Sequence, residues 1–93
     1  MKVEIEDGSC NLDFLYSKRR KYAVINEVWI DEDFRRRGVG TNLLEKAIQL
    51  AKEEGCYKIL GMSRFSNIPS HSLFKKVGLK KWGYEFRLEL GDR

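Results

Sequence analysis

Hydrophobic periodicity changes abruptly near Thr41, and this change limits the folds open to the chain. Before it, apolar and polar residues alternate as in half-buried strands, which predicts strands over 2–6, 12–17 and 22–30. After it, apolar residues recur every three or four positions, which predicts an amphipathic helix over 42–54. Because a short turn joins the second and third strands, we expect an antiparallel meander of three strands.

The second half of the chain continues the alternation of helices and strands. The first helix should end at Gly55, and the second should begin at a cap formed by Asn67 or Ser70. The remaining predicted elements are a short buried strand over 57–62, a helix over 67–77, and one long strand or two shorter ones over 79–90. The strand-helix-strand order implies a right-handed crossover with parallel pairing. The summed order β-β-β-α-β-α-β predicts an α+β domain with a mixed, mostly antiparallel sheet.

The net charge of +4 permits binding to nucleic acid or to an acidic surface. However, the basic residues are dispersed over 18–21, 35–37 and 75–81 rather than gathered in one stripe. Dispersed Lys and Arg residues are more typical of a solvated surface, and the chain has no interleaved aromatic and basic motif. We therefore do not expect a nucleic-acid partner.

Length and cysteine usage indicate a cytoplasmic protein of a single domain. The 93 residues suffice for one core, and no apolar run approaches the ~20 residues that cross a bilayer. The N-terminal sequence has no signal-peptide core, so no membrane association is expected. Cys10 and Cys56 show no metal-ligand spacing, which predicts two reduced thiols and no metal.

The segment 35–41 (RRRGVGT) lies between the predicted strand over 22–30 and the predicted helix over 42–54. This order presents backbone N–H groups and a helix N-terminus to an anion, and the arginines add positive charge. The dinucleotide pattern GxGxxG does not fit, because the chain has Asn42-Leu43 where the third glycine should stand, and the Walker A pattern is absent. A tight turn with solvated arginines is the structural alternative. The functional interpretation is a site for another phosphorylated ligand.

Residues 28–44 resemble the acetyl-CoA-binding motif of the GNAT superfamily of N-acetyltransferases. That motif, Arg/Gln-x-x-Gly-x-Gly/Ala, is matched here by Arg35, Gly38 and Gly40. Residues 67–79 are similar to the later Asn-x-x-Ala-x-x-(Phe/Leu)-(Tyr/Phe)-x-x-x-Gly-Phe segment of the same family. The resemblance covers roughly residues 22–90. It implies a truncated acyl-CoA N-acyltransferase fold and a single acetyl-CoA-binding domain over 1–93.

The resemblance also implies how acetyl-CoA would be held. The pyrophosphate would lie along the loop that ends at Thr41, and the pantetheine arm would pair with the strand backbone near Val28–Ile30. Asn67 would hold the far part of that arm, and Ser70 would approach the coenzyme. The cofactor-binding residues implied in this way are Val28, Trp29, Ile30, Arg35, Arg36, Arg37, Gly38, Val39, Gly40, Thr41, Asn67, Ser70 and Phe74.

Acetyl transfer to a primary amine needs a base for the ammonium proton and an acid for the leaving thiolate. The resemblance makes Glu27 the candidate base, with a rim carboxylate in an ion pair as the alternative. The acid of the family is usually a Tyr, but this chain has Phe74 there. His71 is a candidate catalytic residue, and Ser72 and Tyr84 are further substitutes. A thiolate can also leave without a dedicated acid, because a thiol pKa lies near ~8.5.

The chain begins with what resembles the second strand of the family, without the usual N-terminal strand and two helices. This implies an open acceptor groove, a wall supplied by a homodimer partner, or a domain that binds the coenzyme without catalysis. A small sheet with an uncovered apolar face also favours a homodimer. We expect an N-acetyltransferase with an unidentified amine acceptor, and a weak or inactive acetyl-CoA-binding regulatory domain as the alternative.

Overall fold

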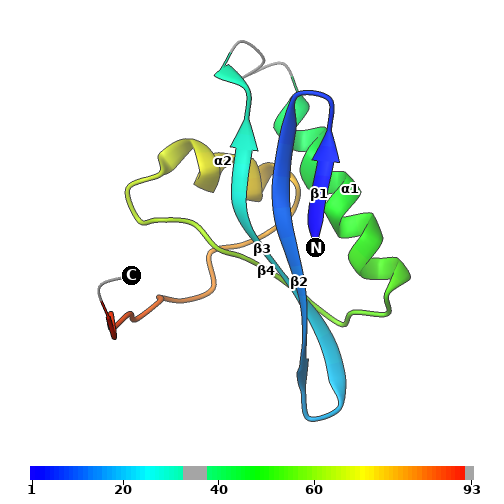
Figure 1. Cartoon of the computed structure of the whole chain (residues 1–93), viewed down its shortest axis with the longest axis vertical. Helices are drawn as coiled ribbons and strands as arrows, with labels where there is room; N and C mark the ends of the chain where they lie inside the picture. Colours follow the sequence, from blue (N-terminus) through cyan, green and yellow to red (C-terminus); the bar gives the residue numbers. More distant parts are fainter. Residues whose placement is uncertain (33–37, 92–93) are drawn as a thin grey trace.

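The computed structural model describes residues 1–32 and 38–91. The elements in chain order are β1 (Lys2–Ile5), β2 (Gly8–Ser17), β3 (Arg20–Ile30), α1 (Val39–Glu53), β4 (Ile59–Gly61) and α2 (Ile68–Lys76). They form a sheet of order β1-β2-β3-β4, in which the first three strands are antiparallel and β4 is parallel to β3 (Figure 1). The predicted α+β class with a mixed, mostly antiparallel sheet is confirmed.

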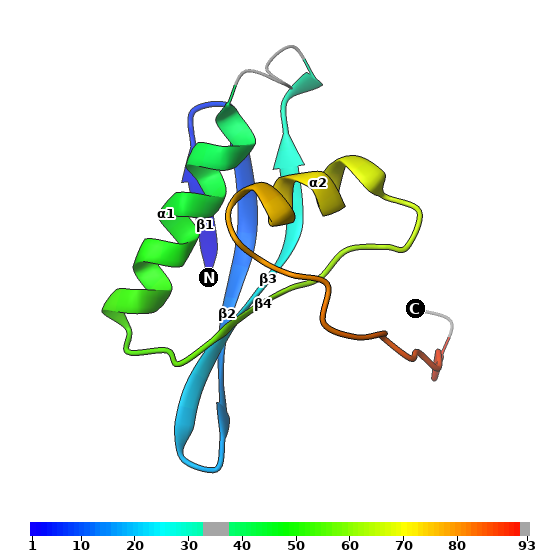
Figure 2. The ribbon, with the colours of Figure 1, turned by 180° about the vertical axis from the view of Figure 1, so that it is seen from behind.

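Both helices cover the same face of the sheet. In Figure 2, which is turned by 180° from Figure 1, the helices lie in front of the sheet. Alternate residues of the strands point to this face, as the period of two requires. The buried core comprises Val3, Cys10, Leu12, Ala23, Ile25, Leu43, Leu44, Ala47, Ala51 and Phe74. The apolar stripe of α1 therefore packs on the meander, and the opposite face of the sheet carries neither helix.

Local signals located the start of α2 and the end of α1 correctly, whereas α1 begins at Val39, three residues before its predicted start. The Asn67 side chain caps α2 by accepting a hydrogen bond from the Ser70 backbone N–H at 3.2 Å. After α1, Gly55 has φ 78°, and its N–H donates to the Lys52 carbonyl while the Cys56 N–H donates to the Ala51 carbonyl. These two bonds are the Schellman arrangement, which satisfies carbonyls left open at a helix end. The predicted end of α1 at Gly55 is thus confirmed.

The predicted strand over 79–90 is wrong as a description of this structure. Residues 80–91 contain no strand and form no backbone hydrogen bond to any other described residue. They leave the sheet after α2 and run away from β3 (Figure 1). Alternation alone cannot form a strand, because a strand needs a neighbour for its N–H and C=O groups. The short β4 therefore remains the edge of the sheet.

The sequence also led us to expect free thiols, no membrane-spanning segment and no metal site. Cys10 is buried and Cys56 half-buried, and both are free thiols as predicted. Within residues 1–32 and 38–91, neither helix has the length and apolar character needed to cross a membrane. In the same ranges, no three His, Cys, Asp or Glu side chains gather where they could hold a metal ion.

Candidate active site

The candidate site begins where β3 and β4 separate. Their parallel pairing ends at Ile25 and Gly61, and one further bond joins the Met62 N–H to the Ile25 carbonyl at 2.9 Å. Beyond this point β3 continues to Ile30, while the segment that follows β4 turns away toward α2 (Figure 2). On that side, residues 26–28 have no neighbouring strand among the described parts of the chain. An extended ligand can add to such a strand as a further strand does.

A β-bulge interrupts β3 in this exposed stretch, and the sequence analysis did not predict it. The register with β2 shifts between Ser9 and Asn11, so that Glu27 and Val28 stand opposite Cys10 alone. Glu27 has φ 54°, a left-handed conformation that costs a residue other than glycine about 1–3 kcal/mol. Bulges re-aim side chains and often lie beside active sites.

The bulge also changes which residues of β3 face the helices. Before it, Ala23 and Ile25 are buried in the core, and after it Val28 and Ile30 pack against the core. The buried positions thus change from odd to even numbers. Because a shift of one residue moves a side chain to the other face, this change of phase was the sequence signal that could have located the bulge.

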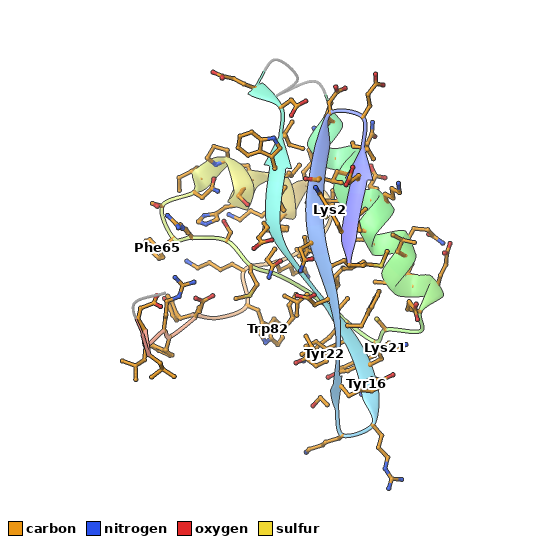
Figure 3. The ribbon with its side chains drawn as sticks, viewed as in Figure 1. Lys2, Tyr16, Lys21, Tyr22, Phe65 and Trp82 are labelled. Carbon is orange, nitrogen blue, oxygen red and sulfur yellow. The ribbon has the colours of Figure 1, made fainter. Side chains whose placement is uncertain are left out.

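An open pocket of about 240 Å³ lies beside the bulge and is lined by Lys2, Ser9, Cys10, Asn11 and Glu27. Figure 3 shows Lys2 on the face of the sheet that the helices leave open. Burial raises the pKa of the Cys10 thiol, which keeps it protonated and unsuited to nucleophilic attack. Glu27 is the one carboxylate among the residues that line this pocket, and its side chain is exposed.

A buried acceptor without a partner lies next to Glu27. The Asn26 side-chain oxygen is buried, and no described residue donates a hydrogen bond to it. Asn26 follows the last β3 residue that pairs with β4. Because buried polar atoms in folded proteins nearly always have a partner, this oxygen fits a donor supplied by a ligand or by water.

The N-terminus of α1 has the backbone geometry of an anion site. Its N-cap, Gly38, has φ 81°, and no side chain caps the helix or places negative charge in its first turn. The first bond into the helix runs from the Asn42 N–H to the Gly38 carbonyl at 3.0 Å. The N–H groups of Val39, Gly40 and Thr41 have no acceptor among the described residues. Such groups, together with the helix dipole, favour a phosphate.

Gly40 has a packing role that the sequence analysis did not foresee. A Cβ atom at Gly40 would lie 2.8 Å from a terminal methyl of Leu73 in α2. Residues 28–44 and 67–79, separate in the sequence, are therefore in contact at this point. This contact brings α2 beside the start of α1, and Figure 2 shows the two helices side by side there.

Phe74 is buried, and its ring packs on the backbone of β4. A Cβ atom at Gly61 would lie 2.8–2.9 Å from two ring carbons of Phe74 and 2.8 Å from a methyl of Leu79. The ring therefore holds α2 against the sheet at the point where β3 and β4 separate. The structure thus gives Phe74 a definite packing role.

Replacing Gly61 with Ala is expected to lower the free energy of unfolding by about 1–3 kcal/mol, because the methyl would force a rigid ring to move. Urea denaturation followed by circular dichroism measures this change. The matched control is Gly83→Ala, where no atom lies within 4 Å of the new methyl. Equal stability of the two variants would contradict the packing described for Phe74.

The chain matches the model of the acetyltransferase (GNAT) family over residues 8–79. It is 42% identical over 74 residues to an uncharacterised N-acetyltransferase of Methanocaldococcus jannaschii, covering 78% of this chain and 33% of that protein. It is 35% identical over 78 residues to an N-alpha-acetyltransferase of Saccharolobus solfataricus, covering 83% of this chain and 46% of that protein. The chain belongs to the GNAT family.

A solved structure extends this comparison to the fold. It has a TM-score of 0.80 at 14% identity, covers 91% of this chain and 61% of its own, and contains the bisubstrate analogue CoA-S-monomethyl-acetylneamine. At this identity the likeness concerns the GNAT fold alone. The chain spans about a third of the length of the first curated GNAT relative and less than half of the second.

The structure describes the positions of some GNAT motif residues but not of others. Arg35, Arg36 and Arg37 lie outside the described residues, so their role stays a prediction. Trp29 is exposed at the end of β3, and its indole N–H donates to the Asp31 carboxylate at 3.2 Å. The roles predicted for the other cofactor-binding residues likewise remain predictions, now with positions on β3, α1 and α2.

The candidate acids of the GNAT reaction are not all brought to one place. His71 donates through Nε2 to the Arg64 backbone carbonyl at 2.8 Å, which ties α2 to the loop before it. Tyr84 belongs to the segment that leaves the sheet, away from the end of β3. Ser72 is exposed on α2. The catalytic role predicted for His71 remains a prediction, beside this observed structural role.

Proposed function

We propose that this chain is an acetyltransferase domain that passes the acetyl group of acetyl-CoA to a primary amine. The observation that carries the proposal is the uncapped N-terminus of α1 at Gly38, contacted by α2 at Gly40 and following a β3 that extends beyond β4. This arrangement offers an anion site and an open strand edge within one short segment of chain. Those are the two features that a phosphorylated, extended thioester needs.

The groups present fit coenzyme A in charge and shape. The N–H groups of Val39, Gly40 and Thr41 would take the pyrophosphate, and the side chains at 35–37 would add positive charge there. The pantetheine arm would lie along residues 26–30, where the Asn26 oxygen can accept a hydrogen bond from an amide N–H. The thioester would then reach the bulge at Glu27.

The proposed reaction uses Glu27 as the base. The Glu27 carboxylate would take a proton from the acceptor ammonium, directly or through water, so that the amine nitrogen can attack the thioester carbonyl carbon. The carbon–sulfur bond then breaks and the thiolate leaves, accepting a proton from solvent. Phe74 cannot donate that proton, but a thiol pKa near ~8.5 makes the thiolate a fair leaving group.

The acceptor is proposed to be a primary amine of a peptide, a protein or a small molecule. The pocket beside Glu27 is open rather than enclosed and contains the polar side chains of Lys2, Ser9 and Asn11. An open polar pocket suits the end of a larger molecule. The N-alpha-acetyltransferase activity named for the relative from Saccharolobus solfataricus makes a protein N-terminus the first acceptor to test.

Isothermal titration with acetyl-CoA tests the first half of the proposal. The wild-type chain should bind, and Gly38→Ala should weaken the affinity roughly tenfold, because a Cβ would enter the open space at the helix N-terminus. Gly55→Ala is the matched control. Gly55 has φ 78° and open space around it, but it lies at the opposite end of α1. Both variants should lose similar stability, and only Gly38→Ala should lose affinity.

The second half of the proposal is tested by transfer of acetyl to a panel of peptides and small amines. Absence of binding at high micromolar acetyl-CoA would overturn the whole proposal. Binding without transfer to any amine would instead favour a regulatory domain that keeps the coenzyme site. The buried Phe74, which occupies the position of the usual Tyr, is the observation that favours this second candidate.

A further inference from the structure

The turn that joins β2 to β3 is both basic and strained. Because Ser17 pairs with Arg20, the turn has only two residues, Lys18 and Arg19, and their φ angles are 49° and 70°. A two-residue turn with positive φ at both positions is normally made by Asn-Gly, since most residues with a Cβ atom are strained there. Strain of this kind is concentrated at binding sites and other functional positions. The chain thus keeps two basic side chains at the tip of the hairpin at a cost in stability.

Aromatic rings lie beside this tip. The guanidinium carbon of Arg20 lies 3.7 Å from the centroid of the Tyr57 ring. The Lys58 Nζ atom lies 5.2 Å from the ring centroids of both Tyr57 and Tyr22. The Tyr57 N–H donates to the Lys21 carbonyl at 2.9 Å, which holds the segment before β4 against the hairpin. We call this set of basic and aromatic residues the hairpin patch; it comprises Lys18, Arg19, Arg20, Tyr22, Tyr57 and Lys58.

Folding changes how the basic residues are distributed. The sequence predicts no nucleic-acid partner, because its basic residues are dispersed and are not interleaved with aromatic ones. In the folded chain the basic stretch 18–21 lies beside Lys58, and the Tyr57 ring contacts cations from both. Figure 3 shows Lys21 and Tyr22 on this hairpin. Basic and aromatic side chains are therefore interleaved in space, although they are not interleaved in the sequence.

The positive charge of the hairpin patch is not neutralised by the described parts of the protein. Within residues 1–32 and 38–91, no carboxylate forms an ion pair with a basic side chain of the patch. The neighbouring Glu54 is already bound to Lys21, at 3.0 Å. All four basic side chains of the patch are exposed. A cluster of exposed cations of this kind attracts a polyanion.

An open pocket of about 180 Å³ adjoins the hairpin patch. Tyr57 and Lys58 of the patch line it, together with Lys52 and apolar side chains of α1 and β4. An aromatic and apolar lining with two lysines beside it suits a nucleobase and the phosphate next to that base. The pocket therefore points to a polyanion that also carries flat rings.

We propose that the hairpin patch binds single-stranded RNA, with its basic side chains on the phosphates and its tyrosine rings stacked on bases. An acidic peptide would match the charge of the patch, but it has no bases to stack on the rings. A duplex has phosphates but keeps its bases stacked on one another. RNA loops and ends offer phosphates and unstacked bases together, and base recognition in RNA is concentrated there.

The hairpin patch is separate from the proposed acetyl-CoA site. The β2–β3 hairpin projects beyond the end of α1, whereas the N-terminus of α1 lies at the other end of the sheet (Figure 1). RNA and acetyl-CoA therefore bind at different places. Substitutions in the patch should change the affinity for RNA and leave the affinity for acetyl-CoA unchanged, so failure of this proposal can be told apart from failure of the proposed acetyl transfer.

Fluorescence polarisation of the full chain with a labelled single-stranded RNA of about 12 nucleotides tests the proposal. The wild type should bind at low salt with a Kd of about 10 μM or lower, and a plot of log affinity against log salt should have a slope of about −3, as four phosphate contacts would give. An RNA duplex of the same length should bind roughly tenfold more weakly. Absence of binding, or equal binding of the duplex, would overturn the proposal. Polyglutamate that displaced the RNA as well as unlabelled RNA does would overturn it too.

The double variant Lys18→Asn, Arg19→Gly tests the tip of the hairpin in a protein that should fold better than the wild type. It should raise the melting temperature by about 4 °C or more, because it relieves two strained φ angles. It should also make the salt slope less steep by about 1.4, because two phosphate contacts are lost. The matched control, Lys75→Gln with Lys76→Gln, removes the same charge from exposed positions of α2 and should leave RNA binding unchanged. Equal weakening by both double variants would mean that net charge, not the hairpin patch, holds the RNA.

Tyr57→Leu tests the stacking. It should weaken RNA binding roughly tenfold, the loss expected when one base loses an aromatic partner. Tyr57→Phe should retain the wild-type affinity, because it keeps the ring that stacks on the base and on Arg20. If Tyr57→Leu bound RNA as tightly as the wild type, or if Tyr57→Phe bound as weakly as Tyr57→Leu, the stacking would be wrong, and with it the choice of RNA as the partner.

Discussion

Replacing Glu27 with Gln is expected to lower kcat for acetyl transfer by about 10²–10⁴-fold, the range that a positioned general base contributes. Glu27 lines the pocket beside the bulge, and its left-handed backbone aims it away from the regular path of β3. Gln keeps the size and polarity of the side chain but cannot take a proton. The affinity for acetyl-CoA, measured by titration, should therefore stay unchanged.

The pH profile separates a missing base from a damaged pocket. At high pH the acceptor amine is already deprotonated, so the deficit of Glu27→Gln should shrink. For an α-amino acceptor with a pKa of about 7.7–8.0 the deficit should shrink above about pH 8, whereas for lysine, with a pKa of about 10.4, it should persist there. The profile thus also reports the acceptor class.

A second glutamate serves as control for Glu27→Gln. Glu53, in the last turn of α1, accepts a hydrogen bond from Gln49 and lies far along the helix from Gly38. Glu53→Gln should keep full activity. If Glu27→Gln also kept full activity at neutral pH, Glu27 would not be the base, and the rim carboxylate interpretation would hold.

Features that depend on near neighbours in the chain could be predicted from the sequence. The cap at Asn67 and the glycine end of α1 are local, because each is formed by residues within five positions of one another. The same holds for the change of period near Thr41. These signals established the helices, the meander and the glycine-containing approach to α1 before any tertiary contact was known.

Features that depend on a partner from elsewhere could not be predicted in this way. The bulge at Glu27 can be located only once each residue of β3 is matched with its partner in β2. The contact of Gly40 with Leu73 depends on how the two helices pack. The segment 79–90 alternates like a strand, but alternation does not say which strand lies beside it. The sequence therefore predicted the glycine-containing segment before α1, where the coenzyme is proposed to bind, better than the pocket beside Glu27 that is proposed for the acceptor.

The core beneath the candidate site can be tested by a substitution far from any ligand. Leu12→Ala is expected to lower the free energy of unfolding by about 2–5 kcal/mol, because it removes buried methyl groups and leaves a cavity. Leu12 is fully buried on β2, directly opposite Ile25, which is also fully buried. A loss of this size is a large part of the ~5–15 kcal/mol that stabilises a typical domain.

Leu15→Ala on the same strand is the matched control, since Leu15 is 42% exposed and should lose much less stability. Urea denaturation measures both variants. Equal losses would mean that the face of β2 assigned to the core is wrong, and with it the register that opposes Cys10 to Glu27 and Val28. Because acetyl-CoA would bind only the folded chain, saturating coenzyme should raise the melting temperature of Leu12→Ala. That result would show that folding of the core and binding of the coenzyme are thermodynamically linked.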